Sequence, residues 1–236
     1  MRDDVILITG GTSGYGFETA KLFAENGCHV VVTGRYEDRL HETAKAIGVD
    51  TFRADATDPE DWEKLAAYIQ EKYGRIDLLM NNAGGGVAIK ETDRLTVEEI
   101  DRCIRLNLNS VIYGARAFTP MLKAQGHGTV INVSSVCAKQ AWPGWSVYAS
   151  AKWGVLGFTK GLTTELGPYG IRVTCLIPGA GATNFDKNAN FTERGTVPAL
   201  KGADIAKAVY DVYQLPDHVF VEEITVWGMD QVVIPL

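Results

Sequence analysis

The chain has few cysteines and histidines, and neither type is arranged as a metal site or a disulfide framework would require. Its 236 residues include four cysteines, with no C-x-x-C pair among them: Cys28, Cys103, Cys137 and Cys175. The four histidines also lack the short spacing of metal ligands. We therefore expect buried, reduced thiols and no bound metal.

Long apolar runs and a strong charge of one sign are missing as well. No run approaches the ~20 residues that span a membrane, and Val5–Ile8 is too short for the hydrophobic core of a signal peptide. The net charge is −6 and the isoelectric point about 5.3, which offers no basic surface to nucleic acid or to an anionic membrane. These absences predict a cytoplasmic protein without a nucleic-acid or membrane partner.

Short apolar segments alternate with amphipathic segments up to about residue 180. The apolar segments are rich in Val and Ile, which is typical of parallel strands buried on both faces; they are Val5–Thr9, His29–Thr33, Thr51–Ala54, Ile76–Met80, Thr129–Val133 and Ile171–Ile177. The expected helices are Tyr15–Asn26, Asp38–Ile47, Pro59–Tyr73, one from a capping box at Thr96–Glu99 into the Asn107 region, one ending near Ala124, and Ser146–Leu166. This alternation predicts a Rossmann-type α/β fold, a doubly wound parallel sheet with helices on both faces.

Beyond residue 180 the alternation stops. Residues 182–197 are polar and mixed, and we expect them to form a substrate lid between Gly181 and Pro198. A helix is expected at Asp204–Gln214 and a short last strand at Glu223–Trp227. Because no linker interrupts the chain, the prediction is a single dinucleotide-binding and catalytic domain over residues 1–236.

A glycine-rich turn joins the first expected strand to the first expected helix. Three glycines there can form a tight turn, let the backbone approach a pyrophosphate, and let the helix pack on the strand. The free N–H groups of the helix N-terminus then face the phosphates. The residues expected to bind the cofactor in this turn are Gly10, Thr12, Ser13, Gly14, Tyr15 and Gly16.

The glycine spacing T-G-x-x-x-G-x-G resembles that of the short-chain dehydrogenase/reductase family. Further motifs of that family follow in order: Asn81-Asn82-Ala83-Gly84, Asn107, Ser134-Ser135, the Y-x-x-x-K pair Tyr148 and Lys152, Pro178-Gly179, and Thr183. The resemblance covers residues 3–185. It departs from the family near the C-terminus, where Trp227-Gly228-Met229-Asp230 replaces a D-G-G segment.

The resemblance implies a hydride transfer between a nicotinamide cofactor and a carbonyl or alcohol carbon. Tyr148 would exchange the proton, Ser135 would donate to the substrate oxygen, Lys152 would hold the ribose, and Asn107 would hold a water for proton relay. Tyr148 and Lys152 are four positions apart on an expected helix, so the ammonium is predicted to lower the tyrosine pKa. Further cofactor contacts implied by the family are Asp55, Asn82, Ala83, Gly84, Pro178, Gly179 and Thr183.

The end of the second strand predicts a preference for NADP(H) over NAD(H). Gly34 stands where an acidic residue would bind the ribose 2′-hydroxyl, and Arg35 follows with a guanidinium suited to a 2′-phosphate. Ser13 is neutral where many NADP-using relatives have a second basic residue, and Glu37 and Asp38 follow closely. A solvated loop arginine is the alternative interpretation of Arg35.

The substrate is less well specified. Lys139, Gln140 and lid residues favour a small polar substrate such as a hydroxy acid, polyol or aldehyde, whereas Trp142 and Trp145 suit a larger apolar ketone. Two other functions fit these motifs less well. A catalytically silent dinucleotide-binding regulator would be expected to lack Ser135, Tyr148 or Lys152, and all three are present. Sugar-nucleotide epimerases resemble the spacing T-G-x-x-G-x-x-G, which is absent here. Family members commonly pair through two long helices, so we expect a homotetramer or homodimer, with Trp153, Val155, Phe158 and the tail Val232–Leu236 as contact residues.

Overall fold

The structure is a computed structural model that describes residues 3–85, 88–181 and 200–229. Its strands form one seven-stranded parallel sheet in the order β3-β2-β1-β4-β5-β6-β7. The strands are β1 (Val5–Thr9), β2 (His29–Gly34), β3 (Asp50–Arg53), β4 (Leu78–Asn81), β5 (Gly128–Val133), β6 (Ile171–Pro178) and β7 (Glu223–Val226). The predicted parallel sheet is therefore confirmed.

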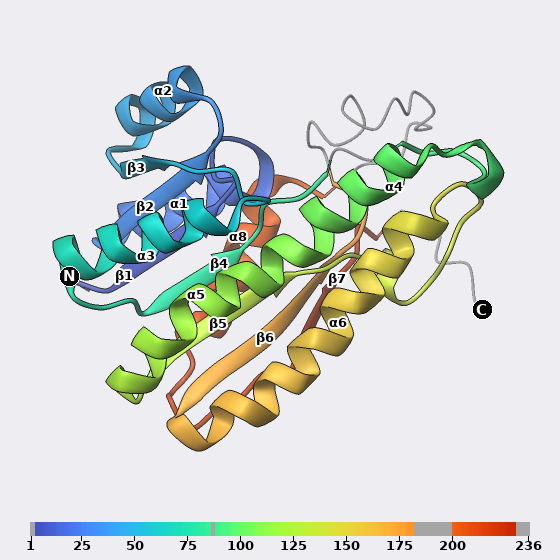
Figure 1. Ribbon diagram of the computed structural model, residues 1–236. Helices are drawn as coiled ribbons and strands as arrows, with labels where there is room; N and C mark the ends of the chain where they lie inside the picture. Colours follow the sequence, from blue (N-terminus) through green and yellow to red (C-terminus); the bar gives the residue numbers. More distant parts are fainter. Residues whose placement is uncertain (1–2, 86–87, 182–199, 230–236) are drawn as a thin grey trace.

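Helices cover both faces of the sheet. They are α1 (Gly14–Glu25), α2 (Glu37–Ile47), α3 (Pro59–Tyr73), α4 (Val97–Ile104), α5 (Ser110–Gln125), α6 (Ser146–Leu166) and α8 (Gly202–Tyr213). Helices α3, α5 and α6 lie in front of the sheet in Figure 1, and α1 and α8 lie behind it. Shorter turns are 3₁₀-helical at Thr92–Arg94, Val136–Ala138 and Gly167–Tyr169 and π-helical at Arg105–Asn109. The fold is doubly wound, as predicted.

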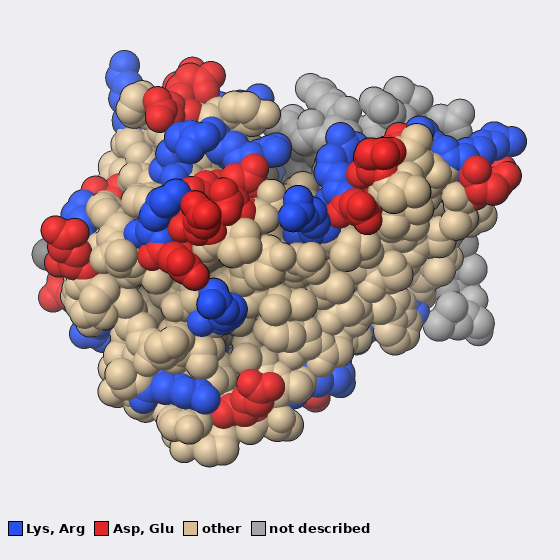
Figure 2. All heavy atoms as spheres, in the orientation of Figure 1, with Lys and Arg blue, Asp and Glu red and all other residues tan. Residues whose placement is uncertain are grey.

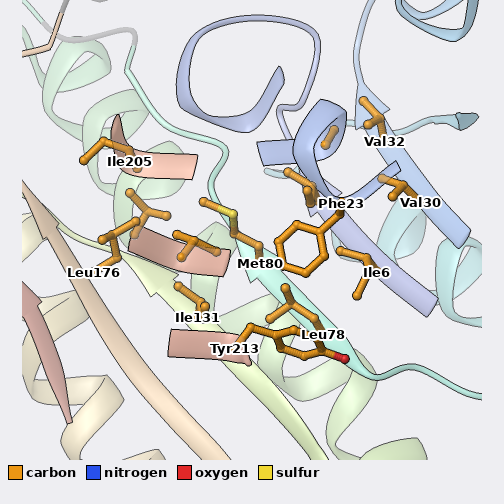
Figure 3. Close-up of a cluster of buried hydrophobic side chains, with 14 of the residues drawn as sticks. Ile6, Phe23, Val30, Val32, Leu78, Met80, Ile131, Leu176, Ile205 and Tyr213 are labelled. Atoms are coloured by element: carbon orange, nitrogen blue, oxygen red, sulfur yellow. The ribbon is translucent and has the colours of Figure 1, made fainter. Parts of the chain in front are cut away.

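The apolar core is divided by the sheet into two main layers. Neighbouring residues of β1 belong to different layers: Ile6 packs with Phe23 of α1 and Tyr213 of α8 (Figure 3), and Leu7 packs with Phe118 of α5. Burying each such side chain contributes roughly 1.5–3 kcal/mol. This two-sided burial explains why the strands are apolar throughout. Three of the four cysteines are also buried, whereas Cys28 is half-buried.

The structure corrects some expected boundaries. Pro59–Tyr73 and Ser146–Leu166 have the predicted limits, and Thr96 and Glu99 form the predicted capping box. The fourth strand, however, begins at Leu78 instead of Ile76. Just before it, the buried carboxylate of Asp77 accepts a hydrogen bond from the N–H of Val5 (2.8 Å) and pairs with Arg75.

The expected lid over residues 182–197, the residues Gly86 and Val87, and the tail Val232–Leu236 lie outside the described residues. Within the described ranges, no helix combines the length and the apolar character needed to cross a lipid bilayer.

The strand order brings the candidate site residues to one edge of the sheet. Strands β2 and β3 are added on one side of β1, and β4 to β7 are added on its other side, so the order of strands reverses between β1 and β4. These two strands pair in parallel, Ile6 with Leu78 and Ile8 with Met80. The carboxyl ends of neighbouring parallel strands meet at the same edge, and a crevice for ligands forms where the winding reverses. The loops after β1, β4, β5 and β6 all start at this edge.

Candidate active site

The glycine-rich turn between β1 and α1 lies against the loop after β4. Gly10 has a φ of +63°, and a Cβ there would lie 3.0 Å from the Cα of Ala83. A Cβ at Gly16 would lie 2.5 Å from Nδ2 of Asn82. Both positions therefore exclude any side chain. Ser13 precedes α1 in extended conformation without a capping hydrogen bond from its side chain, so it leaves the first-turn N–H groups to another acceptor.

Asn82 and Ala83 hold this turn in place. Nδ2 of Asn82 donates to the carbonyl oxygens of Thr9 (2.9 Å) and Gly10 (3.2 Å). The backbone N–H groups of Asn82 and Ala83 both donate to Oγ1 of Thr9, at 3.0 Å each. Thr9 was expected as the last residue of a strand and the first of the glycine-rich motif, without a role for its hydroxyl, which accepts both of these hydrogen bonds. Asn82 thus fixes the glycine-rich turn, which is the segment expected to bind the cofactor.

Lys152 connects the end of β5 with α6. Its side chain is only 4% exposed, and Nζ donates a hydrogen bond to the carbonyl oxygen of Val133 (2.9 Å). Ser134 donates from Oγ to the carbonyl oxygen of Lys152 (2.8 Å). Nζ also lies 5.7 Å from the centre of the Tyr148 ring. The structure therefore brings Tyr148 and Lys152 together on one face of α6, as their spacing predicted.

Asn107 lies in the π-helical turn between α4 and α5 and is fully buried. Its Oδ1 accepts from the N–H of Gly85 (2.9 Å), while Nδ2 donates to the carbonyl oxygens of Gly85 (3.0 Å) and Cys103 (3.0 Å). A Cβ on Gly84 would lie 3.1 Å from Oδ1 of Asn107 and 3.6 Å from Nζ of Lys152. A side chain at position 84 would therefore contact both Asn107 and Lys152, and glycine leaves that space free.

Ser135 lies two residues after the end of β5 and directly precedes the 3₁₀ turn Val136–Ala138, with Oγ accepting from the N–H of Cys137 (3.1 Å). Burial raises the pKa of Tyr148 far above its usual value of 10, and the hydrogen bond with Ser135 opposes this only in part. Burial also lowers the pKa of Lys152 to about 8. The predicted lowering of the tyrosine pKa is thus wrong here, because the loss of hydration on burial raises the pKa of Tyr148.

An apolar layer surrounds the Tyr148 ring. The Tyr148 ring packs edge to face against Trp145, with 5.7 Å between the ring centres. The same apolar cluster includes Trp142, Cys103, Cys137 and Ile89. Lys139, which was expected to meet a polar substrate, instead forms an ion pair with Glu223 (2.7 Å). That pairing joins the loop after β5 to β7, so Lys139 is not placed to contact a substrate.

The remaining predicted cofactor residues are spread along the same edge. Asp55 accepts with Oδ1 from the N–H (2.9 Å) and hydroxyl (2.8 Å) of Thr57, so one of its oxygens stabilises the turn before α3. Pro178 is the last residue of β6, and Gly179 accepts a hydrogen bond from the hydroxyl of Tyr15 (3.4 Å). Gly14 is the first residue of α1. Thr183 lies outside the described residues.

The end of β2 lies beside the glycine-rich turn. A Cβ on Gly34 would lie 3.1 Å from Cγ2 of Thr12. Arg35 follows directly, with its guanidinium carbon 5.5 Å from the centre of the Tyr36 ring. Residues from β2 and from the turn therefore lie next to each other, as a ribose-recognition corner would need.

Comparisons with known proteins agree with this geometry. The model of the short-chain dehydrogenase family matches residues 4–194. An uncharacterized oxidoreductase of Staphylococcus saprophyticus is 36% identical over 96% of this chain and 97% of its own length. Among solved structures, the closed form of a serine dehydrogenase complexed with NADP⁺ has a TM-score of 0.91 at 28% identity, covering 98% of each chain. An alcohol dehydrogenase from Thermococcus sibiricus complexed with 5-hydroxy-NADP has a TM-score of 0.87 at 28% identity, covering 98% of this chain and 99% of its own.

Proposed function

The chain belongs to the short-chain dehydrogenase family, and we propose that it transfers a hydride between a nicotinamide dinucleotide and a carbonyl or alcohol carbon of a small molecule. One observation carries this proposal. Asn107 and Lys152 face each other across Gly84, and Lys152 shares a face of α6 with Tyr148, next to Ser135. A protein that only bound dinucleotides would not need this buried arrangement of titratable groups.

The residues of the glycine-rich turn fit a dinucleotide. Gly10 and Gly16 let the turn pack closely against Asn82 and Ala83 of the loop after β4, and this packing supports the tight turn that a pyrophosphate site needs. The α1 N-terminus offers N–H groups that no side chain caps. Lys152 is suited to the ribose hydroxyls. Ala83, Gly84, Pro178 and Gly179 border the same edge of the sheet.

When bound, the nicotinamide ring gives or accepts the hydride. The protein's residues handle the proton and orient the substrate. Burial raises the pKa of Tyr148 and so keeps the phenol protonated. In the reduction direction this hydroxyl is the group that would give its proton to the carbonyl oxygen as the hydride reaches the carbon. Ser135 donates to the same oxygen as negative charge develops there. Lys152 and Asn107 would return a proton to Tyr148 by way of water near Gly84.

The preferred cofactor in this proposal is NADP(H). Gly34 leaves no carboxylate at the end of β2, and Arg35 is adjacent. Across the described residues Arg35 has no carboxylate partner, which supports a role beyond a surface ion pair. The serine dehydrogenase and the archaeal alcohol dehydrogenase named above are described as complexes with NADP⁺ and with 5-hydroxy-NADP.

The substrate in this proposal is a small polar alcohol or carbonyl compound, such as a hydroxy acid, polyol or aldehyde. The structural likeness to a serine dehydrogenase supports it. A larger apolar ketone is the second candidate, and a specific observation favours it: Trp142, Trp145 and Ile89 form an apolar wall around Tyr148, and the ion pair of Lys139 with Glu223 removes one cation from the substrate side.

We further propose one domain over residues 1–236, a homotetramer or homodimer, and a cytoplasmic location. Support for the assembly comes from α6, where Trp153 is 52% exposed and no atom approaches a Cβ built at Gly157 or Gly161. Charged side chains are sparse over the face of α5 and α6 seen in Figure 2. The expected contact residue Val155 is instead fully buried within the chain, and Phe158 packs on the core.

The test is a substrate screen with purified protein and both reduced cofactors. Hydroxy-acid precursors, sugar aldehydes and bulky aromatic ketones would be offered with NADPH and with NADH while absorbance at the nicotinamide band is followed. Turnover of polar carbonyls would support the first candidate, and turnover of aromatic ketones alone would support the second. Binding of NADPH without turnover of any carbonyl or alcohol would favour the silent regulator and contradict the proposal.

A further inference from the structure

One carboxylate of β7 receives two lysines from different parts of the chain. Glu223 is the first residue of β7, which is an edge strand of the sheet. Its Oε2 lies 2.7 Å from Nζ of Lys139 in the loop after β5, and its Oε1 lies 3.0 Å from Nζ of Lys160 on α6. Lys160 also pairs with the neighbouring Glu222 (3.1 Å). Glu223 therefore links three segments, which are β7, the loop after β5 and α6.

This link is partly shielded from solvent. The Glu223 side chain is only 21% exposed, which is less than either lysine. Hydrogen bonds from Lys139 and Lys160 lower the pKa of the Glu223 carboxyl below its usual value of 4.5, so it is charged at neutral pH. A single pair of exposed charges contributes little to stability, but several charges in one network can fix a geometry. Glu223, with both oxygens in use, is the centre of such a network.

The loop that Glu223 holds contains Ser135 near its start. Two N–H groups of the following turn donate to Ser135, that of Cys137 to Oγ (3.1 Å) and that of Ala138 to the carbonyl oxygen (2.8 Å). The next residue, Lys139, is hydrogen-bonded to the same turn through its own N–H (2.9 Å). The ion pair of Lys139 with Glu223 therefore acts on the turn that orients the Ser135 hydroxyl.

The other lysine belongs to the helix of the proton donor. Tyr148, Lys152 and Lys160 all lie on α6. Between the loop and this helix, Ala138 packs in one apolar cluster with Leu156 of α6. The segment that contains the expected donor to the substrate oxygen and the helix that contains the expected proton donor are thus attached to the same carboxylate of β7.

We propose that Glu223 is a positioning residue for hydride transfer, which through Lys139 fixes the Ser135 hydroxyl relative to Tyr148. This inference rests on the proposed function and adds a residue to it. A displacement of about 1 Å in a reacting group can slow a reaction by up to about 100-fold. A loosened loop after β5 therefore slows the chemical step. Cofactor affinity is little affected, because the glycine-rich turn is held by β1 and the loop after β4.

The test uses variants of the full chain, with glyceraldehyde and 2-acetonaphthone as carbonyl probes. Glu223→Gln removes the carboxylate charge, and Lys139→Met removes its partner in the loop. Each should lower kcat by about five- to ten-fold and leave the dissociation constant of NADPH within about two-fold. Because both changes break one link, the double variant should be no slower than the slower single variant. Lys207→Met, which breaks an ion pair with Asp211 inside α8, is the matched control and should keep the wild-type kcat.

Hydrogen exchange of the ligand-free protein separates positioning from general stability. In Glu223→Gln and in Lys139→Met, the amides of residues 137–140 should exchange several-fold faster than in the wild type. Their N–H groups bond within the turn that has lost its ion pair. Exchange in β1 and α1 should match that of the wild type, and the melting temperature should change by only a few degrees.

The outcomes separate this inference from the proposed function. If the wild type reduces neither probe with NADPH or NADH, the proposed function is contradicted, and the role of Glu223 with it. If the wild type is active and Glu223→Gln keeps the kcat of Lys207→Met, the proposed function holds and the inference is wrong. Faster exchange throughout the sheet in Glu223→Gln would indicate a general loss of stability and would also overturn it. A double variant much slower than either single variant would mean that Glu223 does not act through Lys139.

Discussion

Lys152 and Val133 are joined by a hydrogen bond of 2.9 Å from the lysine ammonium to the backbone carbonyl at the end of β5. The next residue, Ser134, returns a hydrogen bond from its hydroxyl to the carbonyl of Lys152. These two hydrogen bonds connect the end of β5 to α6 and fix the position of Lys152 relative to Ser135. A side chain fixed in this way has little rotamer freedom left to lose when a ligand binds.

The buried ammonium makes a first prediction, on stability against pH. The pKa of Lys152 is about 8 in the folded chain and near 10.5 when exposed, so folding disfavours its charged form. That penalty is fully present below pH 8 and disappears as pH rises toward 10.5. The free energy of unfolding of the wild type, minus that of Lys152→Met, should therefore rise by about 2 kcal/mol between pH 7.5 and 9.5.

Urea titrations of the two proteins at several pH values measure this difference, since groups common to both cancel. The variant should be well folded, because methionine fills a similar volume and leaves no buried charge. If the difference in unfolding free energy between the two proteins stayed constant or fell over this pH range, folding would not lower the pKa of Lys152.

A second prediction concerns Tyr148. Tyr148→Phe removes the hydroxyl and keeps the ring that packs against Trp145. Melting temperature and cofactor affinity should stay near those of the wild type, while kcat falls by orders of magnitude. If the purified variant retained a tenth of the wild-type kcat, another group would have to be the proton donor.

Gly34 gives a third prediction, with a matched control. Gly34→Asp should shift the ratio of kcat/KM from NADPH toward NADH, because a carboxylate at the end of β2 repels a 2′-phosphate and accepts from a 2′-hydroxyl. Any Cβ at this position lies 3.1 Å from Cγ2 of Thr12 and costs some stability. Gly34→Ala has the same steric contact without the charge, so it should weaken both cofactors alike. An equal ratio in the two variants would show that the charge at this position does not select the cofactor.

Gly84 gives a fourth prediction. In Gly84→Ala the methyl group would stand 3.1 Å from Oδ1 of Asn107 and 3.6 Å from Nζ of Lys152, where it displaces any water between them. We expect kcat to fall at least ten-fold, with a loss of only a few degrees in melting temperature. Gly167→Ala, an exposed site in helical conformation with no atom near the added methyl group, is the control and should leave kcat unchanged. Equal activity of both variants would argue against a proton path beside Gly84.

The fifth prediction is on assembly. Trp153→Glu places a charge on the exposed face of α6, next to Gly157, and should convert a tetramer into smaller species. Multi-angle light scattering at micromolar concentration measures the mass of both proteins. A monomeric wild type would contradict the proposed assembly at once, and an unchanged tetramer in the variant would place its interface elsewhere.

The sequence predicted most of the elements because each one repeats a simple local rule. Val5–Thr9 is apolar at every position, and Pro59–Tyr73 begins and ends at residues that favour helix limits. The Tyr148 and Lys152 pair was predictable for the same reason, since spacing on a helix fixes a shared face.

What the sequence could not predict depends on partners far along the chain. Lys139 resembled a substrate contact until the structure paired it with Glu223 of β7. Val155 and Trp153 are two positions apart on α6, and only the packing of that helix decides which one is buried. The π-helical turn around Asn107 has no pattern of its own, because its geometry is held by the loop residue Gly85.

The strand order also bears on how the chain is made. β1 leaves the ribosome before the other described strands, yet it lies in the middle of the sheet, between β2 and β4. Its partner on one side is complete by Gly34, but the partner on the other side begins only at Leu78. For a few seconds of synthesis, therefore, one edge of a strand that is buried at every position in the folded protein has no partner within the nascent chain. An unpaired apolar edge of this kind attracts other chains, so rapid production of this protein should depend on chaperones that cover it until residue 78 has emerged.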